Sequence, residues 1–131
     1  MNIQMKTIEL KTATVSLRDD GIMHIHIKGG AEMDLADAIA VVEAIGKLGD
    51  KRKFPVLIDC EEFSSVDKEA RIFSASKEAN IYTLADAVAY HSLAHQLFAN
   101  FYVNHNKPDV PTKVFPDNEA AISWLKTFKR K

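Results

Sequence analysis

The segment from Phe54 to Cys60, FPVLIDC, is a short and almost continuously apolar run. A run of this length is typical of a strand buried on both faces within a parallel sheet. The residues before it have the periodicity of a helix that Asp34 caps and Gly49-Asp50 ends. A second helix is expected after it, over 67–79. A buried strand between two helices predicts an α/β domain.

The rest of the chain supplies further strands and helices, with turn residues between them. Strands are expected at Thr12–Arg18, Ile22–Lys28, Leu84–Tyr90 and Thr112–Phe115, and two more helices after the caps Ser92 and Asp117. The order ββαβαβαβα predicts one domain over 1–131, with a mixed, mostly parallel five-stranded sheet flanked by four helices. Binding sites in such folds lie at the carboxyl ends of parallel strands, here the turns after Cys60, Tyr90 and Phe115.

Composition narrows the partner classes. The chain has 131 residues, and 17 Lys and Arg stand against 18 Asp and Glu. This balance gives no electrostatic reason to expect nucleic acid or an anionic membrane. The basic run over 126–131 is interpreted as cations that complement the dipole at the end of the last helix.

Three features predict a cytoplasmic protein. The single cysteine, Cys60, cannot form an internal disulfide, which fits a reducing compartment. The first residues, Met1 to Lys6, do not have the pattern of a secretion signal. No apolar stretch approaches the length of a membrane span.

Several strings in the second half of the sequence resemble a known family. They are Ser65–Arg71 (SVDKEAR), Ala87–Tyr90 (AVAY), Asn100–Pro108 (NFYVNHNKP), Pro111–Phe115 (PTKVF) and Glu119–Leu125 (EAAISWL). Together with the element order, they resemble the STAS or SpoIIAA-like superfamily, and most closely its bacterial STAS/SEC14-type branch. The resemblance implies the SpoIIAA-like fold and a regulatory module without enzymatic activity.

The resemblance also implies a phosphorylation site, which this chain lacks. In regulatory STAS proteins a kinase phosphorylates the helix after the third strand, within an Asp-Ser-Ser-Gly or Asp-Thr-Ser-Gly pattern. Alignment of Asp67 with the Asp of that pattern places Lys68, Glu69 and Ala70 where Ser, Ser and Gly would stand. We therefore expect no phospho-switch at this position. Whether Ser64 or Ser65 is ever phosphorylated stays open.

The segment 59–68 is the richest polar stretch and has two interpretations. Its side chains could line a small binding site for a ligand or partner at the end of the buried strand; these are Asp59, Ser64, Ser65, Asp67 and Lys68. The favoured alternative is that Ser64 with Asp67, or Ser65 alone, caps the next helix.

Neither the histidines nor Cys60 predicts a metal or catalytic site. His24 and His26 share one face of a strand, but two ligands are at most half of a metal site, so a solvated face is expected. The spacing of His91 and His95 lacks the Glu of a zincin motif. Carboxylates beside Cys60 are expected to raise the pKa of its thiol. We expect no catalytic residue, no metal and no cofactor.

The third helix carries two groups of apolar side chains. Leu93, Leu97 and Phe101 share one face and are expected in the core. Phe98 and Tyr102 lie about a quarter-turn round and are expected to form an apolar contact surface, unless the last helix covers them with Trp124.

Three functions follow from these observations. The first is a non-enzymatic module that acts by protein contact or as a homodimer. The second is a carrier or sensor of a small apolar or lipid-like ligand, with a pocket between the sheet and the third and fourth helices. The third is an enzyme that uses the 59–68 turn, and no base–nucleophile pair supports it.

Overall fold

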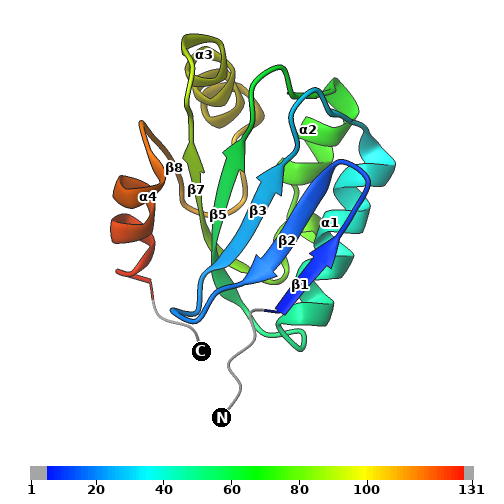
Figure 1. Ribbon diagram of the computed structural model, residues 1–131, viewed down its shortest axis with the longest axis vertical. Coiled ribbons are helices and arrows are strands. Elements are labelled where there is room, and N and C mark those ends of the chain that lie inside the picture. The colour runs from blue at the N-terminus through cyan, green and yellow to red at the C-terminus, as the bar shows by residue number, and fades with distance from the viewer. Residues whose placement is uncertain (1–5, 129–131) are drawn as a thin grey trace.

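Six strands form the main sheet of the computed structural model, which describes residues 6–128 (Figure 1). In spatial order they are β1 (Lys6–Glu9), β2 (Ala13–Leu17), β3 (Met23–Ile27), β5 (Phe54–Cys60), β7 (Thr83–Ala89) and β8 (Thr112–Phe115). The first three strands pair antiparallel, and β3, β5, β7 and β8 pair parallel. The predicted mixed, mostly parallel sheet is confirmed. Its predicted count of five was wrong, because β1 adds an edge strand.

Four α-helices flank the sheet: α1 (Leu35–Leu48), α2 (Lys68–Ala75), α3 (Leu93–Phe101) and α4 (Asn118–Leu125). A 3-10 turn (Glu78–Asn80) follows α2, and a π-helical turn (Tyr102–Asn106) continues α3. Two short parallel strands, β4 (Glu32–Met33) and β6 (Ser65–Val66), form a separate ladder near the starts of α1 and α2. None of the helices within residues 6–128 has the length and apolar character needed to cross a membrane.

The helix caps follow from the sequence. Asp34 accepts a hydrogen bond from the backbone N–H of Asp37 at 2.9 Å, and the Asp37 side chain accepts one from Asp34 N–H at 3.0 Å, a complete capping box. Ser92 and Asp117 cap α3 and α4 as predicted. The prediction of a helix over 67–79 was too long, because the backbone of Ser76 is extended and ends α2 at Ala75.

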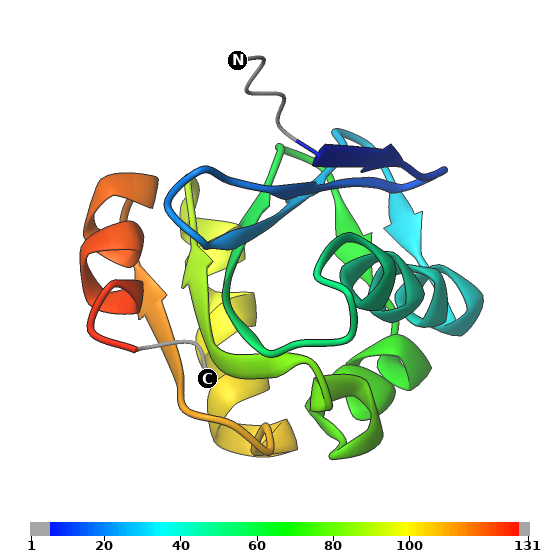
Figure 2. The ribbon, with the colours of Figure 1, turned by 90° about the horizontal axis from the view of Figure 1, so that it is seen from below.

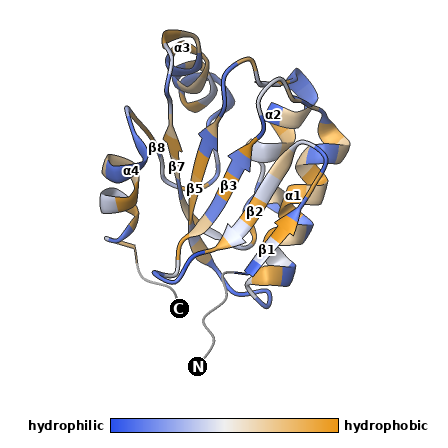
Figure 3. Cartoon of the chain, viewed as in Figure 1, coloured by the Kyte–Doolittle hydropathy of each residue, from blue (hydrophilic) through white to orange (hydrophobic). Residues whose placement is uncertain are grey.

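Alternate side chains of the central strands point to opposite faces of the sheet. Ile25, Ile27 and Val56 face α1 and α2, whereas Leu57 faces α4. Figure 2 shows α1 and α2 on one side of the sheet and α4 on the other. β7 and most of β5 take the hydrophobic colour in Figure 3, as expected for strands covered on both faces.

The face under α4 is only partly covered. α4 packs against β5, β7 and β8, and its buried Ala121 and Leu125 meet Leu57 there. β3 lies beyond this contact, so His24 and His26 are half-exposed on the same face. One face of the sheet is thus covered by α1, α2 and α3, and the other has an open, polar margin. Residues 129–131, the end of the basic run over 126–131, lie outside the described part of the chain. Residues 1–5, in which the sequence predicts no secretion signal, also lie outside it.

Candidate functional site

A cavity of about 150 Å³ lies between the sheet and the helices α1, α2 and α3. Its walls are mostly apolar, with Ile25, Ile58 and Val88 from the sheet and Val41, Ile45 and Ala99 from the helices. A pocket had been expected between the sheet and the third and fourth helices. That location was wrong, because α4 packs on the opposite face.

Asp86 is the polar residue that stands out in this cavity. It lies in the middle of β7, it is buried, and its side chain has no hydrogen-bond partner among the described residues. Burial raises the pKa of Asp86 to about 7, because the charged form loses its hydration without compensation. A buried carboxyl without a partner is costly, and native structures satisfy almost all such groups. Asp86 is therefore a group that a bound molecule can satisfy.

Other polar atoms lie around the same space. Tyr102, from the π-helical turn, lines the cavity, and burial together with the nearby Asp86 carboxylate raises the pKa of its hydroxyl above the usual value. Arg71 Nε and His95 Nδ1 are buried, belong to lining residues, and have no hydrogen-bond partner. The cavity therefore combines an apolar interior with a few unsatisfied polar groups, as binding sites for small molecules do.

Arg71 is fixed at the cavity edge by two kinds of contact. Its Nη1 donates a hydrogen bond to the carbonyl of Val66 at 2.8 Å. The guanidinium lies over the rings of Phe98 and Phe101, 5.2 Å and 5.8 Å from their centroids. These contacts orient Arg71 and leave its Nε free of protein partners.

The two faces of α3 are reversed relative to the prediction. Leu93, Leu97 and Phe101 are 70%, 62% and 45% exposed, so their assignment to the core was wrong. Phe98 and Tyr102 instead line the cavity. The alternative that Trp124 covers them was also wrong, because Trp124 packs on Phe115 and Phe128 on the far side of the sheet.

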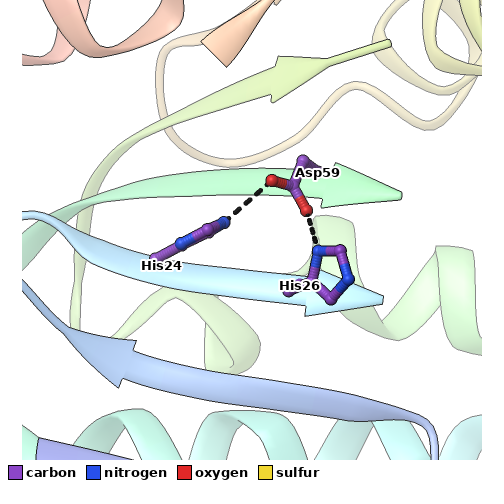
Figure 4. A group of neighbouring side chains, drawn as sticks. All are labelled: His24, His26 and Asp59. Carbon is purple, nitrogen blue, oxygen red and sulfur yellow. Dashed lines mark hydrogen bonds and ion pairs between the residues drawn. The ribbon is translucent and has the colours of Figure 1, made fainter. Parts of the chain in front are cut away.

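On the opposite face, His24, His26 and Asp59 form a polar cluster (Figure 4). His24 Nε2 lies 2.9 Å from Asp59 Oδ2, and His26 Nδ1 contacts Asp59 Oδ1. His26 Nε2 lies 2.6 Å from Glu61 Oε2, and Asn118 Nδ2 donates to Asp59 Oδ2 at 2.9 Å. Both rings are half-exposed on this face, and the neighbouring strand also supplies a carboxylate to both of them, which the sequence does not predict.

The electrostatics of this cluster follow from its contacts. Burial favours the neutral acid, but hydrogen bonds from His24, Asn118 and His26 outweigh it and hold the pKa of Asp59 well below its usual range. Burial lowers the pKa of His26, yet hydrogen bonds with Glu61 and Asp59 outweigh it and raise the pKa above its usual value. Asp59 is therefore an anion, and the two rings point their N–H groups at it.

The polar segment 59–68 does not converge on one site. Asp59 points to the α4 face, while Asp67 caps α2 by accepting from Ala70 N–H at 2.9 Å. Neither serine caps a helix: the Ser64 hydroxyl donates to the carbonyl of Glu61 at 2.7 Å, and Ser65 lies in β6. Lys68 is exposed at the first position of α2.

The thiol of Cys60 is not activated. Burial, and then the charge of Asp59, raises the pKa of Cys60 to about 11. The predicted direction is confirmed, although burial and not charge repulsion is the larger cause.

Comparison with known proteins identifies the family of this chain. Residues 15–129 match the family described as "Domain of unknown function (DUF7793)". The chain belongs to that family. No curated protein gives a significant match.

The structural likeness confirms the fold expected for this DUF7793 chain. An uncharacterised protein of the DUF3478 family from Shewanella loihica PV-4, described as having a SpoIIAA-like fold, aligns with a TM-score of 0.57 at 12% identity. The alignment covers 95% of this chain and 97% of that one. A protein of unknown function from Arthrobacter sp. FB24 aligns at 23% identity with a TM-score of 0.32, over 87% and 99% of the two chains.

The sequence around Asp86 contains a signal for a buried polar site. The strand Thr83–Ala89, TLADAVA, is apolar except for its first residue and one carboxylate in its middle. A charged side chain inside a strand covered on both faces is almost never left there without a partner or a role. Asp59 is likewise a carboxylate inside an apolar strand, FPVLIDC, although the sequence pattern assigns it to the polar turn that follows.

Proposed function

We propose that this protein binds a small, largely apolar molecule with one hydrogen-bonding group, in the cavity between the sheet and α1, α2 and α3. The observation that carries the proposal is the Asp86 carboxyl, which is buried at the wall of a mostly apolar cavity and has no hydrogen-bond partner among residues 6–128. A ligand that donates a hydrogen bond to this group satisfies it, and its apolar part fills the remaining space.

The size of the cavity limits the ligand. A dry cavity of about 150 Å³ lined by apolar side chains is large enough for benzene. The cavity here has a similar volume. Sites for drug-sized ligands are larger, about 300–1,000 Å³. A single ring or a short branched chain therefore fits, whereas a complete lipid does not fit this conformation.

The polar atoms that line the cavity define which hydrogen-bonding group the ligand carries. Asp86 can accept a hydrogen bond, while Arg71 Nε can donate one. A hydroxyl or an amino group on the ligand matches the acceptor, and a hydroxyl can also accept from the donor. Phenol is the simplest molecule that has the right size and both capacities.

The residues that line the cavity favour ligand binding without catalysis. The one thiol at the cavity, Cys60, is protonated because its pKa is raised to about 11. The side chain that hydrogen-bonds to this thiol is Ser64, a hydroxyl and not a base. A thiol acts as a catalytic nucleophile when its pKa is lowered or a base lies beside it, and Cys60 has a raised pKa. We therefore infer a carrier or sensor and not an enzyme.

Isothermal titration calorimetry with phenol tests the proposal. Ala99 lines the cavity on α3, and Ala94 is exposed on the same helix. Ala99→Leu should fill the cavity and weaken phenol binding at least about tenfold, whereas Ala94→Leu should leave it unchanged. Equal binding to both variants, or no saturable binding to the wild type, contradicts the proposal.

Self-association is the second candidate function, and the exposed row on α3 favours it. Leu93, Leu97 and Phe101 are exposed, and α3 contains no charged residue. Two copies of such a helix can pack antiparallel in a symmetric contact, and the net charge of −1 per chain gives little repulsion. Light scattering should then show a dimer that Leu97→Gln disrupts. A monomer at all concentrations contradicts this candidate. Lys68 stands at the start of α2, where regulatory STAS proteins carry a phosphorylated Ser or Thr. A regulatory role of this chain would therefore depend on protein contact and not on phosphorylation at that position.

A further inference from the structure

We propose that His24, His26 and Asp59 bind one divalent first-row transition-metal ion of the zinc class. Each residue offers one ligand atom, and these three atoms lie within 4.8 Å of one another. The cluster lies on the face of the sheet opposite the cavity and is independent of the function proposed for the cavity.

The strand register creates this arrangement. His24 and His26 are two residues apart on β3 and share one face, and Asp59 of β5 is the direct register partner of His26. The two imidazoles approach from different directions, with their planes at 75° and their centroids 6.2 Å apart. The carboxylate lies between the His24 Nε2 and His26 Nδ1 atoms (Figure 4). Rings that converge at an angle suit a compact coordination sphere better than stacked rings do.

The distances are close to those that a metal requires. Two ligands of a tetrahedral zinc ion, each about 2.0–2.1 Å from the metal, are about 3.3 Å apart. His24 Nε2 and Asp59 Oδ2 are 2.9 Å apart. The half-exposed rings must turn to bring all three ligand atoms, which lie within 4.8 Å of one another, to the metal spacing, and the ion then replaces the protons that now lie between nitrogen and oxygen.

The charges at the cluster also favour a cation. Asp59 and Glu61 are two carboxylates, and among residues 6–128 their ion pairs are with the two histidines, not with lysine or arginine. The side chain of Asp59 is only 7% exposed, so water compensates little of its charge. Two imidazoles and one carboxylate form a donor set that zinc and its neighbours in the first transition row accept.

The surrounding residues resemble the outer shell of a metal site. A histidine that binds metal usually donates its other ring N–H to a carboxylate, which fixes the ring and its tautomer. His26 does this with Glu61, because its Nε2 lies 2.6 Å from Glu61 Oε2 while Nδ1 faces Asp59. Glu61 in turn lies against Gly29, where an added Cβ would be 3.0 Å from Glu61 Oε1.

A fourth ligand to the metal ion can come from two sources. Asn118 donates from Nδ2 to Asp59 Oδ2 at 2.9 Å, and its Oδ1 is buried without a partner. A half-turn of this amide brings Oδ1 to the position of Nδ2 and offers an oxygen to the ion. The second source is water, because an open pocket of about 590 Å³ borders His26, Asp59 and Glu61.

Titration of tag-free, metal-stripped protein with Zn²⁺ and with Co²⁺ tests the proposal. Calorimetry should give one Zn²⁺ per chain, and Co²⁺ should develop visible absorption bands of a low-symmetry N,O site. His24→Gln and His26→Gln should each weaken binding about tenfold or more. His105→Gln is the matched control, because His105 stacks on Phe101 away from the cluster and should not affect binding.

Imidazole NMR signals provide a test that does not depend on variants. In ¹⁵N-labelled wild-type protein, substoichiometric Zn²⁺ should shift the ring nitrogens of His24 and His26 and leave those of His105 in place. Binding that the two glutamine variants do not weaken, or ring signals of His24 and His26 that do not respond, overturns the proposal. A wild-type protein that binds phenol but does not bind Zn²⁺ would contradict this site and not the cavity.

Discussion

Asp86 and Tyr102 line the same cavity, one from strand β7 and one from the π-helical turn after α3. Burial raises the pKa of the Tyr102 hydroxyl, and the negative charge of Asp86 raises it further. The two residues lie in different layers of the fold, and each lacks a protein hydrogen-bond partner among the described residues. This pair contributes two polar groups to the wall of a mostly apolar cavity.

The buried carboxyl of Asp86 predicts a pH-dependent stability. Burial raises the pKa of Asp86 in the folded protein to about 7, whereas an unfolded aspartate has a pKa of about 4. Between these values the folded state holds more protons, so the free energy of unfolding should fall as the pH rises from 4 to 7. The loss is up to about 4 kcal/mol. Urea unfolding at a series of pH values measures it.

Asp86→Asn provides the control for this pH dependence. The amide cannot ionise, so the free energy of unfolding of this variant should fall less between pH 4 and pH 7 than that of the wild type. The quantity to compare is the change in the free energy of unfolding with pH, not its absolute value. The introduced amide also lacks a hydrogen-bond partner and so changes the absolute stability. Identical pH profiles for the two proteins would show that Asp86 does not titrate in this range.

The hydrogen-bond network of Asp59 predicts a large effect of its removal. Asp59→Ala removes a carboxylate that accepts from His24, His26 and Asn118. Breaking such a network at a buried charge should lower the free energy of unfolding by about 3 kcal/mol at pH 7. Chemical denaturation measures it. The exposed Asp109 is the matched control, and Asp109→Ala should change stability by less than about 0.5 kcal/mol. Equal effects of the two variants would mean that the network contributes nothing.

Gly46 in α1 predicts an exception to the usual preference for alanine in helices. Alanine normally stabilises a helix interior by about 1 kcal/mol relative to glycine. A Cβ at Gly46 would lie only 2.5 Å from Cε2 of Tyr82. Gly46→Ala should therefore destabilise the fold by about 1–3 kcal/mol. In a Tyr82→Leu background the same substitution should cost less, and thermal unfolding of the four proteins completes the cycle. A destabilisation that persists without the ring would exclude this contact as the cause.

The exposure of Leu97 predicts a small mutational effect where the sequence pattern indicates a core position. Leu97→Ala should change the free energy of unfolding by less than about 0.5 kcal/mol, because the side chain is 62% exposed. Leu57→Ala, at a fully buried position in β5, should cost about 2–5 kcal/mol. Denaturant titration of both variants decides between the two environments. A cost for Leu97→Ala close to that of Leu57→Ala would restore the predicted core face of α3.

Much of the fold could be predicted because its signals are local. The apolar run of β5 and the caps Asp34, Ser92 and Asp117 each determine structure through their immediate neighbours. β1 gave no such signal, because most of its residues are exposed and do not alternate in burial. Periodicity showed which residues of α3 share a face, but not which face meets the sheet.

The candidate sites depend on contacts that a sequence pattern does not contain. His24 and His26 were predicted to share a face, which is correct, but their partner Asp59 comes from a strand 33 residues further on in register with β3. The cavity depends on how α1, α2 and α3 pack over one face of the sheet. Its polar group, Asp86, is visible in the sequence only as one carboxylate within an apolar strand.

Methyl NMR during a phenol titration tests the cavity most directly. In ¹³C-methyl-labelled protein, phenol should cause saturable shifts of Ile25, Ile58 and Val88, whose side chains line the cavity. Leu57 and Leu125, buried on the opposite face of the sheet, should not respond. Shifts confined to the exposed Leu93 and Leu97, or the absence of saturable shifts at the three cavity residues, would contradict a ligand site between the sheet and its helices.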